Sequence, residues 1–196
     1  MAVTADRRIA GAAAAFAALV IVASAGDGGW LGDADRSLFE TVRAHRGPAG
    51  TAAARIISAS GEPTVIYPGL MAAAAARRVS WQHACLAGVV IATGAEARRR
   101  LSRVIARQRP PAEAWLTQPE GYSLPSRHTT MAALAAGAYV HVLGLRGTPA
   151  RAAPMLAAAI VGSSRVYLGV HWPADVVAGW LFAEGWLRLC SPTQKG

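Results

Sequence analysis

Charged residues are scarce in this chain. Of its 196 residues only 16% are charged, whereas 53% are apolar. The apolar residues form long blocks rather than the alternating or amphipathic patterns that surround a soluble core. The composition therefore argues against a soluble globule, and the length corresponds to one domain, residues 1–196.

Cysteine is nearly absent. Cys85 and Cys190 lie in or beside different apolar blocks, and they form neither a disulfide framework nor a CxxC metal site. We interpret both as small hydrophobic side chains. Internal repeats of 20–50 residues and low-complexity linkers are also missing, which excludes a repeat array and a division into linked domains.

Acidic residues are outnumbered by basic ones, 11 to 20, which leaves a net charge of +9. Six of the arginines lie in the stretch ARRRLSRVIARQRP, residues 97–110. Such a cluster typically binds an anion. The chain has no zinc-binding, helix-turn-helix or aromatic-interleaved basic motif. We therefore expect no nucleic-acid partner.

Six apolar blocks are present instead. Residues 9–26, 79–95 and 128–145 have about the length of a membrane-spanning helix. Three shorter blocks cover 63–76, 152–164 and 176–189. Together they predict an all-α fold, a six-transmembrane-helix bundle. The many Ala and Gly residues have two explanations of similar weight: close helix packing in lipid, or a bias of the genome composition.

The arginines also predict an orientation. With the N-terminus in the cytoplasm, Arg7, Arg8, Arg146 and Arg151 lie inside and the first long loop lies outside, as the positive-inside rule requires. The first block follows two arginines and ends in small residues, as a signal peptide does. Its length favours a retained helix. Residues 97–110 then lie outside although they contain six arginines. We attribute this exception to the positive-inside rule to a functional role of the arginines.

Three polar clusters fall at the outer ends of the predicted helices. The first is Arg109-Pro110 after the third helix, and the second is the stretch 125–128 at the start of the fourth. The third runs from Arg165, at the end of the fifth helix, to Asp175 in the sixth. Because successive helices cross the membrane in opposite directions, the helix ends that carry the three clusters all lie on the same side. We therefore predict that the clusters meet at one face of the bundle.

These residue types suit phosphoryl transfer. His171 and Asp175 are four residues apart and share a helix face, so the carboxylate can fix one tautomer and leave a nucleophilic nitrogen. Arg109 and Arg165 offer planar forks for phosphate oxygens. His128 can protonate a departing oxygen. A zinc site would bring histidines together without arginines in the same pocket, so we expect no metal.

The same residues resemble a known family. R-x5-H-x3-D at Arg165, His171 and Asp175, P-S-x-H at 125–128, and R-P at 109–110 are similar to the three signature motifs of the type-2 phosphatidic acid phosphatase superfamily. The order agrees, and the resemblance covers about residues 60–190. It implies a six-helix membrane fold.

The resemblance also implies roles. His171 would attack phosphorus and form a phosphohistidine, which water would hydrolyse, and Asp175 would orient the imidazole. His128 would protonate the leaving alcohol. Arg109, Arg165 and Ser126 would bind the phosphate oxygens and stabilise the transition state. No metal or other cofactor is implied.

Two positions depart from the family pattern. Ser102 stands where the family has a lysine, and Arg99 and Arg103 are near enough on a helix to replace its charge. Arg127 stands where the family usually has glycine, and we expect it to contact a charged headgroup. The run from Arg98 to Arg100 is expected to meet lipid headgroups or solvent rather than substrate.

The predicted protein is an integral, multi-pass cell-membrane phosphatase, metal-independent, with its site on the extracytoplasmic side. Candidate substrates are polyprenyl phosphates or diphosphates, phosphatidylglycerol phosphate and phosphatidic acid; the oligomeric state stays open. One alternative is a catalytically degenerate protein that binds or transports lipid phosphates. Another is a vanadate-dependent haloperoxidase, whose soluble relatives share these motifs, although the apolar helices argue against it.

Overall fold

A computed structural model describes residues 2–25, 28–76 and 78–190, and all of the regular secondary structure in these ranges is helical. The α-helices are α1 (Ala2–Ser24), α2 (Gly29–Ala44), α3 (Pro48–Ala59), α4 (Pro63–Ala75), α5 (Trp81–Ile105), α6 (Arg127–Val142), α7 (Thr148–Tyr167) and α8 (Pro173–Cys190). A 3₁₀ turn, η1 (Ala112–Ala114), lies in the long connection between α5 and α6.

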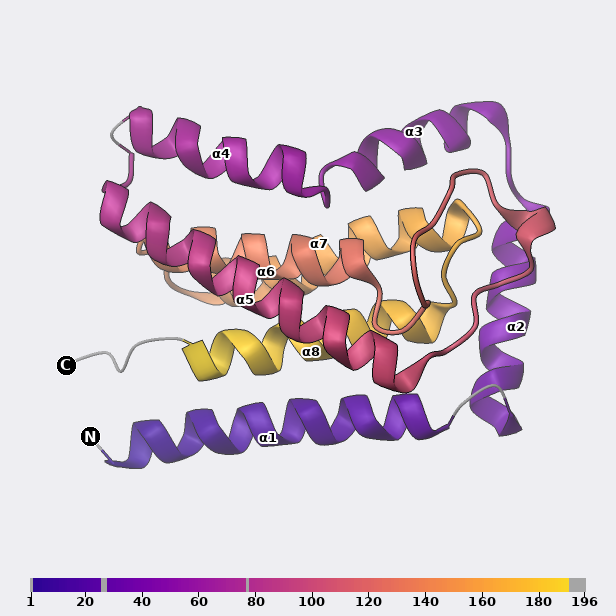
Figure 1. Cartoon of the computed structure of the whole chain (residues 1–196), viewed down its shortest axis with the longest axis horizontal. Coiled ribbons are helices and arrows are strands. Elements are labelled where there is room, and N and C mark those ends of the chain that lie inside the picture. The colour runs from indigo at the N-terminus through magenta and orange to yellow at the C-terminus, as the bar shows by residue number, and fades with distance from the viewer. Residues whose placement is uncertain (1, 26–27, 77, 191–196) are drawn as a thin grey trace.

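The helices α1, α4, α5, α6, α7 and α8 run along the long axis of the molecule, and α3 continues roughly the line of α4 (Figure 1). α1 packs along α8, and α6 packs against α5, α7 and α8. α2 crosses one end of this bundle, and the start of α1 and the end of α8 lie at the opposite end (Figure 1). The connection between α5 and α6 loops back over the end that α2 crosses.

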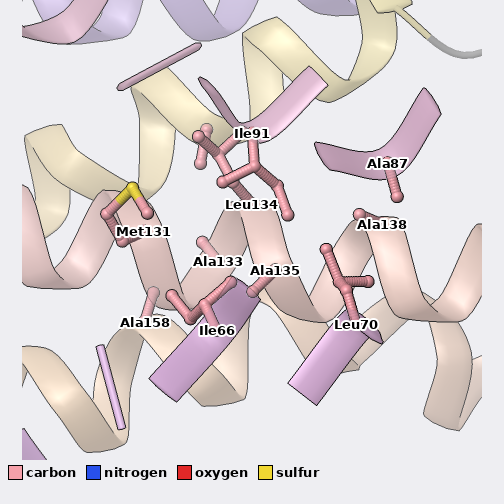
Figure 2. Close-up of a cluster of buried hydrophobic side chains, with 11 residues drawn as sticks. Ile66, Leu70, Ala87, Ile91, Met131, Ala133, Leu134, Ala135, Ala138 and Ala158 are labelled. Carbon is pink, nitrogen blue, oxygen red and sulfur yellow. The ribbon is translucent and has the colours of Figure 1, made fainter. Parts of the chain in front are cut away.

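Small side chains and a few larger apolar ones make up the core between α4, α5 and α6 (Figure 2). Ile66 and Leu70 of α4 and Ile91 of α5 surround Met131 and Leu134 of α6, all of them buried. Four alanines from α6 and α7 fill the remaining space: Ala133, Ala135, Ala138 and Ala158. Small residues let helix backbones approach closely, which explains how α6 can lie between so many neighbours.

Capping and turn residues determine where α5 begins and ends and where the chain turns from α7 to α8, next to the polar clusters. Ser80 caps α5, and its hydroxyl accepts a hydrogen bond from the amide of His83 at 3.3 Å. α5 ends at Ala106, a non-glycine residue with φ 52. The left-handed turn at Ala106 stops the helix directly before Arg107 and Arg109. At the other side of the cluster, Gly169 turns the chain with φ +81 between α7 and α8, close to the Ala114 carbonyl.

Each of the six predicted apolar blocks coincides over most of its described length with a helix, and the described part of the fold is all-α as expected. The predicted first loop is wrong in detail, because residues 29–44 and 48–59 are helical. These two helices were missed because α2 is amphipathic and α3 is short, so neither forms a long apolar block.

The six-span count is not confirmed. Within the described residues one helix, Asp6–Ser24, is long and apolar enough to cross a membrane, with mean hydropathy 1.6, and Pro63–Ala75 is a shorter apolar helix. In α5 the arginines of its last turns dilute the apolar character that its first half supplies.

Candidate active site

The three polar clusters meet at the end of the bundle that α2 crosses. A cavity of about 180 Å³, here named the catalytic cavity, lies where α7 ends and α6 and α8 begin. Its walls include Glu62, Arg109, Arg127, His128, Arg165 and His171, and residues 117–120 cover it. Arg109, His128, Arg165 and His171 thus share one space although they come from four parts of the chain.

His171 is the most enclosed of these groups, with 1% of its surface exposed. Its Nδ1 lies 3.2 Å from Asp175 Oδ2, and its Nε2 lies 3.2 Å from Arg109 Nη1. Nδ1 therefore carries the proton, because it faces a carboxylate, and Nε2 presents a lone pair to the cavity. Burial, followed by the charges of Arg109 and Arg165, holds the pKa of His171 well below its usual value.

Asp175 is fixed by a buried ionic network. Its Oδ1 accepts hydrogen bonds from Arg107 Nη1 at 2.8 Å and Ser123 Oγ at 3.2 Å. The other end of Arg107 donates from Nη2 to Asp35 Oδ2 at 2.7 Å. Asp35, in α2, also accepts from the amide of Ala174 at 2.7 Å. Burial raises the pKa of Asp35, against the opposing hydrogen bond from Arg107.

Sequence reasoning assigned no role to Arg107 or Asp35. Arg107 was one arginine of a basic cluster, and Asp35 was one acidic residue of a predicted loop, about 140 residues before Asp175. No motif spacing joins them. The network forms because α2 folds back over the start of α8, with Phe39 packed against Trp172 at a centroid distance of 5.1 Å.

Arg109 is held by the backbone. Its Nε donates to the carbonyl of Gly121, its Nη2 to those of Glu120 and Tyr122, and its Nη1 to Val170 at 2.6 Å as well as facing His171. All five N–H groups thus have acceptors. Arg109 fixes the covering loop and the imidazole, and it can turn a donor to a phosphate only by releasing one of these acceptors.

Arg165 has N–H groups that no acceptor in the described residues uses. Its Nη1 donates to Ser58 Oγ of α3 at 2.7 Å, and its buried Nε has no hydrogen-bond partner. The side chain is buried, lines the catalytic cavity, and no carboxylate in the described ranges forms a salt bridge with it. Of the two predicted phosphate forks, Arg165 is the one available to a ligand in this arrangement.

His128 forms the second imidazole–carboxylate pair. Its Nε2 lies 2.5 Å from Glu62 Oε1, and Arg127 Nη2 donates to the same oxygen at 3.1 Å. Glu62 precedes α4 directly and was not identified from the sequence as a site residue. Its position, between two predicted helices, carried no signal for this contact.

Two predicted phosphate ligands lie outside the walls of the catalytic cavity. Ser126 is completely buried, and its Oγ accepts from Thr129 Oγ1 at 2.9 Å while its amide donates to the Asp175 carbonyl at 3.0 Å. Arg103 is exposed and lines a neighbouring cavity. Arg127 lines both cavities.

One expectation about the basic cluster is wrong. Arg98 was expected to face headgroups or solvent together with Arg99 and Arg100, and it is instead buried, with Nη1 donating to the Pro125 carbonyl at 3.2 Å. Arg99 and Arg100 are exposed and both pair with Glu96. Arg98 points inward because it lies one helical turn before Ser102, on the same face of α5.

The chemistry of this arrangement is that of a buried nucleophile facing cations. A neutral imidazole, oriented by a carboxylate, presents Nε2 to a small cavity whose walls also include Arg165 and a second imidazole, His128, which is paired with Glu62. Guanidinium groups stabilise an anion whose charge spreads over several oxygens.

Comparisons with known proteins agree with this reading. Residues 102–195 match the family model described as PAP2 superfamily. An undecaprenyl-diphosphatase of Sulfolobus acidocaldarius is 35% identical over 81 residues, which cover 38% of this chain and 34% of the relative. The chain thus matches about a third of the length of that curated relative.

Two solved structures share the fold. The transmembrane PAP2-type phosphatidylglycerolphosphate phosphatase of Bacillus subtilis superimposes with a TM-score of 0.78 and 25% identity over 91% of this chain and 93% of that one. LpxE of Aquifex aeolicus superimposes with a TM-score of 0.64 and 24% identity over 78% and 93%. The fold is thus similar to that of membrane PAP2 phosphatases, and residues 102–195, which include the three motifs, match the model of the PAP2 superfamily.

Proposed function

We propose that this protein is a metal-independent membrane phosphatase that hydrolyses a lipid phosphate or diphosphate through a phosphohistidine. The observation that carries the proposal is the position of His171, with Asp175 on Nδ1 and an arginine-lined cavity at Nε2. The relatives support the substrate class, because those that the comparisons name are an undecaprenyl-diphosphatase and a phosphatidylglycerolphosphate phosphatase.

In the first step, His171 Nε2 forms a bond to phosphorus while the bond from phosphorus to the lipid oxygen breaks. The Nδ1 proton stays with the imidazole, and Asp175 stabilises the positive charge that develops there. His128, which is an imidazolium when the phosphate anion is bound, gives the departing oxygen its extra proton and becomes neutral, and Glu62 orients His128. Arg165 binds the phosphoryl oxygens as their charge spreads in the transition state.

In the second step, water attacks phosphorus, the N–P bond breaks, and inorganic phosphate leaves. His128, neutral after the first step, takes a proton from this water. His171 returns to its starting form with Nδ1 protonated. Each step uses groups that already line the catalytic cavity, and neither requires a redox change.

The long-axis helices fit a bilayer in which α2 lies across the surface at the site end. With the arginines distributed as the positive-inside rule requires, this end faces the extracytoplasmic side. Substrates would then be lipids of the outer leaflet, with the phosphate in the catalytic cavity and the chain in lipid.

The proposal is tested with purified protein in detergent and lipid phosphates as substrates. Phosphate release should persist in the presence of a metal chelator, and His171→Ala should abolish it. Acid-labile, base-stable labelling from a ³²P-labelled lipid phosphate should appear in the wild type and be absent from His171→Ala. Turnover in His171→Ala would overturn the mechanism, and binding without turnover by the wild type would identify a non-catalytic protein instead.

A further inference from the structure

A second cavity adjoins the catalytic cavity. Its volume is about 760 Å³, and it lies between α4, α5 and α6. We name it the side cavity; Tyr67 of α4, Arg98 and Ser102 of α5, and Arg127 and Met131 of α6 line it. Arg127 and Glu120 line both cavities, so the two are direct neighbours.

The wall of the side cavity contains buried polar atoms without partners. Ser102 is 3% exposed and Arg98 is 9% exposed, and neither Ser102 Oγ nor Arg98 Nε has a hydrogen-bond partner. Leaving such an atom buried and unpaired costs about 1–3 kcal/mol. Both atoms belong to the same face of α5, one turn apart. These two atoms have almost no accessible surface, so a ligand would meet this wall at the Nη2 end of Arg98, because Nη1 already donates to the Pro125 carbonyl.

The charge of Arg98 has no direct counterpart, although Glu96, which pairs with Arg99 and Arg100, and Glu120 also line the side cavity. No carboxylate of the described residues forms a salt bridge with Arg98, whose guanidinium donates one hydrogen bond, to the Pro125 carbonyl at 3.2 Å. The charges that act on Arg98 are those of Arg127, Arg109 and Arg99, all cations. Like charges held together in a partly dry wall are favourable only when an anion joins them.

The two cavities are also joined electrostatically. The charge of Arg98 contributes to the lowered pKa of His171, so it acts on the catalytic centre itself. Ser102, where the family resemblance expects a lysine, lies one turn after Arg98 on the same face of α5, and both residues line the side cavity. Arg98 therefore supplies a cation close to the position where the lysine was expected.

We propose that the side cavity binds the second phosphate of a lipid diphosphate, with Arg98 as its main ligand. The protein therefore prefers lipid diphosphates over lipid monophosphates. This inference rests on the proposed phosphatase function. It goes further by naming the substrate class and the residue that selects it.

The geometry of the reaction agrees with this assignment. The catalytic cavity, at about 180 Å³, accommodates the terminal phosphate at His171. When His171 Nε2 bonds to that phosphorus, the bond from it to the bridging oxygen breaks, and a lipid monophosphate leaves with the proton from His128. Arg127, next to His128 in sequence, connects the two cavities and lies on the path of this leaving group. The apolar wall of the side cavity, with Tyr67 and Met131, then receives the first carbons of the chain.

The test compares a polyprenyl diphosphate and the monophosphate of the same chain length, in detergent, with the full chain. Arg98→Gln should lower the ratio of kcat/KM for diphosphate over monophosphate about 10- to 100-fold, the range expected when a charge-assisted hydrogen bond is lost. Arg98→Lys should restore part of the ratio. Arg100→Gln is the matched control: it lies on the same helix, is exposed and pairs with Glu96, and it should leave the ratio unchanged.

A binding measurement separates this inference from the proposed function. Methylenediphosphonate, which cannot be hydrolysed at its bridge, should bind the wild type at least about 10-fold more tightly than inorganic phosphate does, and Arg98→Gln should remove that difference. If the wild type binds methylenediphosphonate in this way but hydrolyses no lipid phosphate, the phosphatase function fails and the subsite stands. If the wild type hydrolyses lipid phosphates and Arg98→Gln affects both substrates equally, the subsite fails and the function stands.

Discussion

At the scale of single residues, the arginines of this site differ in what they bind. Arg109 donates to four backbone carbonyls, Arg107 bridges two buried carboxylates, and Arg165 and Arg98 retain unpaired nitrogens. Loss of activity in Arg109→Ala would therefore reflect a displaced loop as well as a lost phosphate ligand. Arg165 is the better position at which to measure phosphate binding.

The lowered pKa of His171 predicts how stability depends on pH. The folded protein holds the imidazole neutral, whereas the unfolded chain protonates it near pH 6.5. Below that pH the unfolded state therefore binds more protons, and the free energy of unfolding falls by up to about 1.4 kcal/mol per pH unit. Melting temperatures in detergent between pH 7.5 and 5.5 should fall more steeply for the wild type than for His171→Gln. Equal slopes would contradict this assignment.

A second residue-scale prediction concerns Asp35. Asp35→Asn removes the carboxylate that pairs with Arg107, so Arg107 and Asp175 lose part of their positioning. We expect kcat to fall by up to about 100-fold with little change in KM, because a catalytic group displaced by about 1 Å loses that much.

Asp33→Asn is the control for this experiment, since Asp33 lies on the same helix and pairs at the surface with Arg36. Its kinetics should match those of the wild type. A change in KM alone in Asp35→Asn would assign Asp35 to substrate binding instead of positioning.

At the scale of helices, close approach of α6, α7 and α8 brings the catalytic groups together. A Cβ on Gly162 of α7 would collide with the side chain of Val176 in α8, and one on Gly179 of α8 would lie 3.0 Å from the Ser126 carbonyl. Asp175 is carried by the first turn of α8 and His128 by the first turn of α6, whereas His171 lies two residues before α8 and does not share a helix face with Asp175, as the sequence had predicted it would. The separation of these helices therefore determines the width of the catalytic cavity.

Gly162→Ala tests this close packing. The added methyl group must push α8 outward, at a cost of about 1–3 kcal/mol. Gly88→Ala, in α5, is the matched substitution, because a Cβ there meets nothing within 4 Å and alanine stabilises a helix interior by up to about 1 kcal/mol. The melting temperature should fall for Gly162→Ala and stay the same or rise for Gly88→Ala. A rise for both would show that α7 and α8 can separate at no cost.

The helices also show what could be predicted from the sequence. Apolar blocks predicted all six long-axis helices, and the motifs predicted that Arg109, His128, Arg165 and His171 would come together. Asp35 and Glu62 could not be found in this way, because their contacts depend on how α2 and the α3–α4 junction fold over the bundle end. The burial of Arg98 was missed because a run of three arginines is typical of a solvent-exposed surface. Each of the three lies on a different face of α5, and the face of Arg98 is directed toward the protein interior.

At the scale of the whole molecule, the start of α1 and the end of α8 lie at the end of the bundle opposite to α2 (Figure 1), and the catalytic cavity lies at the end that α2 crosses. Cys190, exposed at the end of α8, is close to the chain ends, whereas Glu113 is exposed in η1 near the site. The proposed extracytoplasmic site therefore places Cys190 and Glu113 on opposite sides of the membrane.

Labelling with a membrane-impermeant maleimide tests this orientation. In intact cells that carry Cys85→Ser, the cysteine of Glu113→Cys should react, and Cys190 should react only after the cells are permeabilised. Retained phosphatase activity in both variants shows that they are folded. The reverse pattern would place the catalytic cavity on the cytoplasmic side.

The network from Asp175 to Asp35 has a consequence for how the family segment is understood. Residues 102–195 include every signature motif, yet Asp35, Ser58, Glu62 and Arg98 all precede them. A fragment starting at residue 102 would retain His171 with Asp175 and Arg109. It would lose the residues that pair with Arg107, His128 and Arg165. In this chain the recognisable half contains the reacting atoms, and the less recognisable half sets the electrostatic conditions under which they react.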